Sequence, residues 1–202
     1  LLHPKKLWQK KKFYLAKAKE QKIRHEKSDY TEYSLEPNVK TSPGGLRDIQ
    51  TLQWIASRTF ATQDFKELVA KQIISPLEHD RLVDARAFLW KVRFGLHIIA
   101  KRDENRLLFS HQQSLARHMN YQDKDRLAVE QFMQDYYICA STVYTVNETL
   151  MKYFEEQIWE HNRNKKTIKL DSNFKLVNNL IELSSPSAFQ DTPSALFDMF
   201  LW

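Results

Sequence analysis

The residues with the clearest potential for chemistry lie between positions 38 and 50, where the sequence reads NVKTSPGGLRDIQ. This stretch holds Gly44 and Gly45, two of only three glycines in the chain. They allow the backbone to turn into a helix that we expect to begin near Leu46. The free amides and the dipole at such a helix start favour an anion, and a phosphate group is the usual one.

Charged side chains flank the same turn. Lys40 and Arg47 add positive charge for a phosphate, and Asp48, in the first helical turn, would bind a metal ion held by that phosphate. The alternative is a tight loop whose glycines serve close packing, with Asp48 as a partner of the helix dipole. The residue types alone leave both interpretations open.

Two other patterns imitate metal sites. Asp123 and Asp125 have the spacing of a paired carboxylate, but they fall in a loop between helices, where aspartate is a good N-cap. His79 and Asp80 form a His-Asp dipeptide, but it sits just after Pro76 in the first turns of an amphipathic helix. A metal centre needs further converging ligands, so we interpret both patterns as structural.

The remaining reactive or bulky side chains are expected to be structural as well. Cys139 occupies an inward position of an apolar stripe and is interpreted as a core residue rather than a nucleophile. His97 lies beside another stripe and is expected to be a hydrogen-bonded interior histidine. Trp54, Trp90 and Trp159 are predicted to anchor the core or an interface between domains.

The positive charge is concentrated at the start of the chain. The formal net charge is +6, but residues 1–27 carry ten Lys and Arg against two Glu, a local charge of +8. One hypothesis is an arm that binds nucleic acid or another phosphate-rich partner. The other, which we favour, is the solvated face of a helix whose buried stripe is Trp8, Leu15 and Ala18.

Composition indicates long helices. Three glycines and six prolines in 202 residues are few against about 14 and 10 at average usage, and sheet-rich folds need these residues at turns. The 42% of hydrophobic and 28% of charged residues are those of a folded protein. Apolar periodicity predicts helices over 5–27, 46–59, 62–73, 76 to about 100, 111–120 and 125–159.

Two apolar stripes decide the predicted architecture. One runs from Leu82 to Ile99 and the other from Val129 to Tyr153, both with steps of three and four residues. Pairing them antiparallel buries both. We therefore predict a mainly α fold, an antiparallel helical bundle, with a small β-hairpin near the C-terminus that turns at Asn178 and Asn179. Residues 30–35 also look strand-like.

Other classes are excluded by what the sequence lacks. No run of 18 apolar residues occurs, so no membrane span is predicted. A single cysteine cannot form an internal disulfide and suits a reducing cytoplasm. The chain starts without methionine and ends on an apolar amphipathic run, and we expect it to be a piece of a longer protein.

Several motifs, taken in order, resemble the bacterial protein-PII uridylyltransferase/uridylyl-removing enzymes. The first is EPNVK at 36–40 with GGLRDIQTL at 44–52. Further similarity lies in FLWKVRFGLH, RLLF and FMQDYY, and in PSALF near the end, at residues 88–97, 106–109, 132–137 and 193–197. The related glutamine-synthetase adenylyltransferases share a similar Gly-Gly run, but EPNVK at 36–40 and the tail with PSALF fit the uridylyltransferases better.

The resemblance implies a position within a longer enzyme. In that family a nucleotidyltransferase domain with a Gly-Ser motif precedes a central helical region, and a metal-dependent HD hydrolase domain and two ACT domains follow. Residues 1–27 then correspond to a basic helix leading from the nucleotidyltransferase domain, 28–164 to the central bundle, and 165–202 to a β-hairpin linker with the start of the HD-type domain. The chain contains no Gly-Ser pair, so the catalytic nucleotide motif lies outside it.

The resemblance also implies an activity for the longer enzyme. It would transfer UMP from UTP to a tyrosine of PII with Mg²⁺, release pyrophosphate, remove UMP hydrolytically, and respond to glutamine through the ACT domains. This chain would support the nucleotide site, with Lys40, Gly44, Gly45 and Arg47 nearest the phosphates and Asp48 nearest the metal. Alone, it is expected to be inactive.

A second hypothesis belongs to a different class. Residues 5–27 could make the chain a non-catalytic helical module that binds nucleic acid or an acidic protein. Nucleic acid is the less favoured partner, because basic and aromatic residues do not alternate further along the chain.

Overall fold

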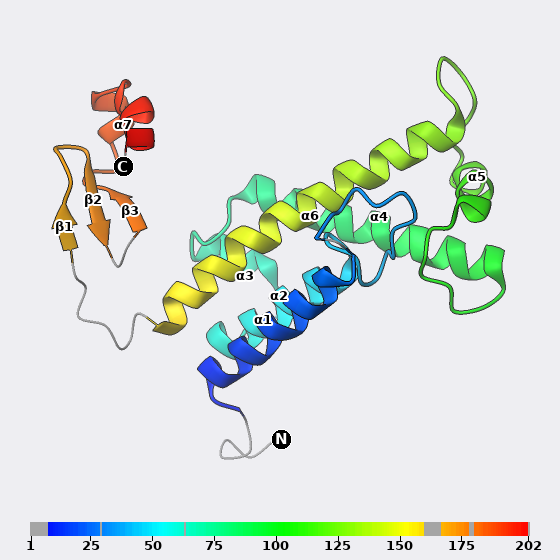
Figure 1. The fold of residues 1–202 in the computed structure, drawn as a ribbon, viewed down its shortest axis with the longest axis horizontal. Helices are drawn as coiled ribbons and strands as arrows, with labels where there is room; N and C mark the ends of the chain where they lie inside the picture. The colour runs from blue at the N-terminus through cyan, green and yellow to red at the C-terminus, as the bar shows by residue number, and fades with distance from the viewer. Residues whose placement is uncertain (1–7, 29, 63, 160–166, 178–179, 202) are drawn as a thin grey trace. The chain divides into compact units, whose positions relative to one another are not determined.

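The computed structural model describes residues 8–28, 30–62, 64–159, 167–177 and 180–201 (Figure 1). The chain divides into two compact units, Leu1–Ile158 and Trp159–Trp202. The first unit is helical, with α1 (Lys10–Glu26), α2 (Leu46–Phe60), α3 (Phe65–Ala70), α4 (Pro76–Ala100), α5 (Phe109–His118) and α6, which extends over Ala128–Trp159. The second holds β1 (Thr167–Lys169), β2 (Phe174–Val177), β3 (Leu180–Leu183), α7 (Ala188–Asp191), α8 (Ala195–Asp198) and the 3₁₀ turn η3 (Met199–Leu201). The predicted mainly α class is confirmed.

Local signals set the helix ends. Ser75 and Glu78 form a reciprocal capping box ahead of α4, with Pro76 in its first turn. Helices α2 and α4 stop at residues in the left-handed conformation, Ala61 and Lys101. The helix predicted over 62–73 begins later in the structure, at Phe65, because the Asp64 side chain accepts from the Lys66 amide and so caps α3. It also ends earlier, at Ala70.

The antiparallel pairing of α4 with α6 is visible in their contacts. The Cys139 thiol donates to the carbonyl of Ala85 at 3.3 Å, and the rings of Phe88 and Phe132 lie 6.4 Å apart. The residue number rises from 85 to 88 along α4 while it falls from 139 to 132 along α6, so the two helices are antiparallel. Along the stripe predicted from Leu82 to Ile99, five residues are buried, namely Leu82, Ala85, Leu89, Val92 and Leu96, whereas Ile99 is only partly buried.

Helix α1 runs antiparallel to α6 (Figure 1), and polar groups join the two helices. The Tyr14 hydroxyl donates to the Met151 carbonyl at 3.0 Å, and the Gln21 amide donates to the Asn147 side chain at 2.6 Å. The predicted buried stripe of this helix is wrong, because Trp8 is 61% and Leu15 49% exposed. The face turned to the bundle is instead Tyr14, Gln21 and His25.

The segment between α1 and α2 is a loop, so the strand-like prediction for residues 30–35 is also wrong. Tyr33 and Leu35 are exposed, and Tyr30 has a φ of 54°, which does not fit extended backbone. An isolated β-bridge follows further along this loop, where Asn38 pairs with Arg106, just before α5. That bridge attaches the loop to the α4–α5 connection.

The second unit is built on an antiparallel sheet in the order β1-β2-β3. The predicted hairpin strands are present, and β1 adds a third strand, with Ile168 opposite Leu176. Phe174 and Ala195 are buried in this unit. The predicted turn at 178–179 lies outside the described residues.

Candidate functional site

The Gly-Gly turn is packed tightly against α6. Gly44 has a φ of +74°, and a Cβ atom at this position would overlap the backbone carbonyl of Ala140. A Cβ on Gly45 would lie 2.8 Å from the Ser42 carbonyl oxygen. At Gly44, only glycine combines the positive φ with so close an approach to α6. The packing interpretation of the two glycines therefore describes this structure.

The backbone amides of the turn are already used inside the protein. Every N–H from 38 to 48 donates to an acceptor within the chain, and Pro43 has none to donate. An anion at the start of α2 would need free amides. Any phosphate contact of this turn therefore depends on side chains. The engaged amides are those of Asn38, Val39, Lys40, Thr41, Ser42, Gly44, Gly45, Leu46, Arg47 and Asp48.

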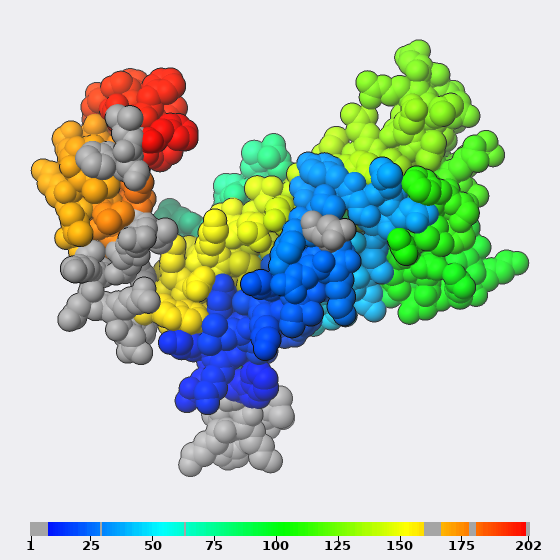
Figure 2. All heavy atoms as spheres, in the orientation of Figure 1, coloured from blue at the N-terminus to red at the C-terminus, as the bar shows by residue number. Residues whose placement is uncertain are grey.

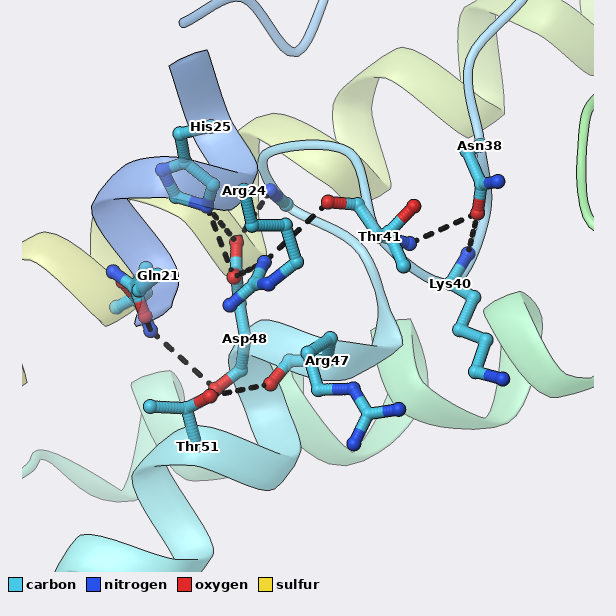
Figure 3. Close-up of polar contacts among 11 residues, drawn as sticks. Gln21, Arg24, His25, Asn38, Lys40, Thr41, Arg47, Asp48 and Thr51 are labelled. Carbon is cyan, nitrogen blue, oxygen red and sulfur yellow. Dashed lines mark hydrogen bonds and ion pairs between the residues drawn. The ribbon is translucent and has the colours of Figure 1, made fainter. Parts of the chain in front are cut away.

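Asp48 is the centre of a buried ionic cluster (Figure 3). Its side chain is 0% exposed, and its carboxylate accepts from the Arg24 guanidinium at 2.6 Å and lies 3.0 Å from the His25 Nε2 atom. Its second oxygen accepts from the Gly44 amide at 2.8 Å. The cluster joins α1, the Gly-Gly turn and α2, because Arg24 and His25 come from α1, Gly44 from the turn and Asp48 from α2.

The same contacts bear on the predicted metal role. Both Asp48 oxygens already have donors, and a cation there would displace Arg24 or His25. Within the described residues, no group of three or more His, Cys, Asp or Glu side chains is arranged to hold a metal ion. These residues do not fit a Mg²⁺ site as they stand. A metal contact of Asp48 stays a prediction for the longer polypeptide, where it requires this cluster to open.

Lys40 and Arg47 are linked through the backbone, since the Arg47 amide donates to the Lys40 carbonyl at 2.9 Å. Their side chains lead away from the Asp48 carboxylate in Figure 3. The Arg47 guanidinium lies 5.5 Å from the ring of Trp54, which the Lys17 amine also faces at 4.3 Å. The structure thus places the predicted phosphate-proximal residues on one turn, but it separates their charges from the cluster.

A cavity of about 800 Å³ borders the cluster at Arg24. It is bounded by the C-terminal half of α1, the loop that follows it, and the side chain of Arg106. Arg24 belongs both to its wall and to the Asp48 cluster. The full lining is Glu20, Ile23, Arg24, Lys27, Ser28, Thr31, Ser34, Glu36, Asn38, Thr41, Ser42 and Arg106.

The other candidate residues have structural contacts. Asp123 accepts from the Ala128 amide at 2.7 Å and so caps α6, while His79 lies 2.9 Å from Asp80 near the start of α4. Burial raises the pKa of the Cys139 thiol to about 12, which disfavours the reactive thiolate. His97 is half-buried, with its Nε2 atom 3.1 Å from a carboxylate oxygen of Asp103.

Arg24 and His25 were missed as site residues because the basic helix was interpreted as a solvated face. One signal was available in the sequence. Tyr14, Gln21 and His25 are spaced by seven and four residues and share one helical face, so a polar contact surface could have been inferred. The partner of that surface, Asp48, is 23 residues beyond His25 and could not have been inferred.

Comparisons with known proteins agree on one family. Residues 12–151 match the family model described as GlnD PII-uridylyltransferase. Proteins named bifunctional uridylyltransferase/uridylyl-removing enzyme are 45% identical in Stutzerimonas stutzeri (strain A1501), 44% in Pseudomonas aeruginosa (strain LESB58) and 42% in Nitrosococcus oceani. These matches cover 96%, 96% and 98% of this chain but only 22% of each relative. No solved structure gives a significant match.

None of the helices among the described residues is long and apolar enough to cross a membrane. The family match includes α1 from residue 12, the Gly-Gly turn, Asp48 and most of α6. The chain belongs to the GlnD PII-uridylyltransferase family.

Proposed function

We propose that this chain is the central helical part of a longer bifunctional enzyme that transfers UMP from UTP to PII and removes it again. The observation that carries the proposal is the family match over residues 12–151, which includes the whole ionic cluster. The names of the relatives support both activities. In this proposal the nucleotidyltransferase and hydrolase centres lie in other parts of the longer polypeptide, and glutamine acts there too.

The role proposed for the chain is to support the nucleotide site. The turn that carries Lys40 and Arg47 is fixed to α6 by the close approach of Gly44 and to α1 by Asp48. A rigid support keeps a charged side chain in place without further loss of entropy when substrate binds. Lys40 and Arg47 would then bind the triphosphate, and Mg²⁺ would neutralise its charge in the longer enzyme.

The test uses the longer enzyme with UTP, Mg²⁺ and PII. The variants Lys40→Gln and Arg47→Gln should each reduce kcat/KM for UMP transfer by about tenfold or more, the effect of one charge-assisted contact. Removal of UMP from modified PII should be unchanged. Lys66→Gln, an exposed change on α3, is the matched control. Normal transfer by both variants would refute the support role.

The 202-residue chain provides a second test. Incubated with UTP, Mg²⁺ and PII, it should transfer no UMP, because it contains no Gly-Ser nucleotide motif. Detectable transfer by the chain alone would contradict the proposed division of labour. Restoring the upstream polypeptide should restore transfer.

A second candidate function rests on the outer face of α1, which is uncovered in Figure 2. Leu15 and Ile23 are exposed there, and the lysines of the same helix add positive charge. Such a surface fits an acidic protein, since apolar side chains gain little from a phosphate backbone. Salt-sensitive binding of a labelled oligonucleotide, lost on neutralising Lys11 and Lys12, would favour nucleic acid instead.

A further inference from the structure

The cavity beside the Asp48 cluster has the size and the polar groups of a ligand site. Its volume of about 800 Å³ lies within the range of small-molecule sites, roughly 300–1,000 Å³. Hydroxyl side chains form much of its lining, and they come from the loop between α1 and α2. These hydroxyl-bearing residues are Ser28, Thr31, Ser34, Thr41 and Ser42.

Among the charged residues that line the cavity, Lys27 has no carboxylate partner that the structure describes. The Glu20 carboxylate lies 2.7 Å from the Lys17 amine, and Glu36 lies 3.7 Å from the guanidinium of Arg106. Each carboxylate of the lining therefore has a cation of its own. Lys27 is exposed on the rim and has no ion pair with any residue that the structure describes. The lining therefore holds more positive than negative side chains, and this charge favours an anion in the cavity.

Arg24 provides the most specific observation. Its side chain is only 11% exposed, and its Nη1 atom donates to Asp48 and to the Thr41 carbonyl. Its Nε and Nη2 atoms are buried and have no hydrogen-bond partner among the described residues. Buried guanidinium donors without acceptors are costly. Because Arg24 also lines the cavity, a ligand there can supply the missing acceptor once the side chain turns toward it.

We infer that this cavity binds a phosphate-bearing ligand, with Arg24 in its wall and Lys27 and Arg106 at its rim. A phosphate group offers the acceptor oxygens that a guanidinium fork and several hydroxyl groups can share. Asp48 holds Arg24 in place from behind, so the fork would be oriented before the ligand arrives. A small movement of the Arg24 side chain would bring its free donors to the ligand.

This site is separate from the predicted phosphate contacts of Lys40 and Arg47. Neither residue belongs to the lining of the cavity. The inference also does not depend on the proposed function, because binding by the 202-residue chain requires no transfer of UMP. Its ligand is either a nucleotide or a free polyphosphate, which share the same chemistry.

The test is calorimetric titration of the 202-residue chain at low salt with pyrophosphate, and separately with UTP, without metal. We expect one pyrophosphate per chain, with an affinity that falls about tenfold in Lys27→Gln and in Arg106→Gln. Tighter binding of UTP would assign the site to a nucleotide, whereas equal binding would assign it to a free polyphosphate. Lys66→Gln, which changes an exposed lysine on α3, should bind as the parent chain does.

Three outcomes would overturn the inference. They are no binding of either pyrophosphate or UTP at millimolar concentration, equal loss in Lys66→Gln and Lys27→Gln, and unchanged affinity in both Lys27→Gln and Arg106→Gln. Arg24→Lys tests the buried donors, and circular dichroism checks that this variant folds. Should Arg24→Lys unfold, the two rim variants carry the test, because neither side chain is buried.

Discussion

The substitution Asp48→Asn tests the central feature of the structure, the ionic cluster between α1 and α2. The side chains of Asp48, Arg24 and His25 are 0%, 11% and 6% exposed. Removing one partner of a buried ion pair leaves an uncompensated charge and costs about 3–5 kcal/mol. Asparagine keeps the shape and one acceptor oxygen, so we expect the free energy of unfolding to fall by about 3 kcal/mol. For a chain of this size, that loss lowers Tm by roughly 6–12 °C.

The assay is urea unfolding at pH 7 followed by far-UV circular dichroism, with the free energy of unfolding taken by linear extrapolation. Asp80→Asn is the matched control, because Asp80 also lies 2.9 Å from a histidine, His79, but is 74% exposed. It should change the free energy of unfolding by less than about 0.5 kcal/mol. A loss below about 1 kcal/mol in Asp48→Asn would refute the buried cluster, since Arg24 would then have found water or another anion.

Three further predictions concern other contacts. Gly44→Ala should destabilise the chain by more than about 2 kcal/mol, because of its positive φ and the Ala140 carbonyl. In Gly95→Ala, by contrast, the close contact of the new methyl is with the end of the Leu115 side chain rather than with backbone. Thermal melts of the two variants should differ clearly. The amide and hydroxyl of the α4 N-cap serine lower the pKa of Glu78 below its ordinary 4.5. This contact therefore stabilises the fold fully above pH 4.5 and is lost as the pH falls through the lowered value, so Glu78→Gln should show a flatter acid-unfolding profile. Burial raises the pKa of Cys139 to about 12, so a thiol reagent at pH 8 should react fast only in denaturant; rapid labelling of the folded chain would contradict its buried position.

The helical part of the fold was predictable because periodicity is a local property. The stripe from Leu82 to Leu96 and the cap at Ser75 both follow from residues within one or two turns. The helix of α1 was predicted as well, but its predicted buried stripe was wrong, because long-range contacts decide which face of a helix is buried. Its apolar residues suggested a buried stripe, but the helix packs through hydrogen bonds such as that between Gln21 and Asn147, separated by 126 residues.

The candidate site was predictable only in part. The Gly-Gly turn and the helix after it were found from residue types, as was the possibility that the glycines serve packing. The cavity next to it was not, because its walls come from α1, the loop that follows and Arg106. Hydroxyl residues spread over a loop have no spacing that marks them as a lining.

The sequence by itself determined the helical class, the limits of the long helices and the family resemblance, since each depends on residue type and local order. Only the tertiary structure decided what the charges do. It paired Asp48 with Arg24 and His25 and used every amide of the Gly-Gly turn internally. Within the part of the chain that the structure describes, two nitrogens of Arg24, which lines a cavity, have no acceptor. The physical reason is that a carboxylate and a guanidinium attract whichever partner the fold brings near. That proximity is set by packing between helices rather than by distance along the chain.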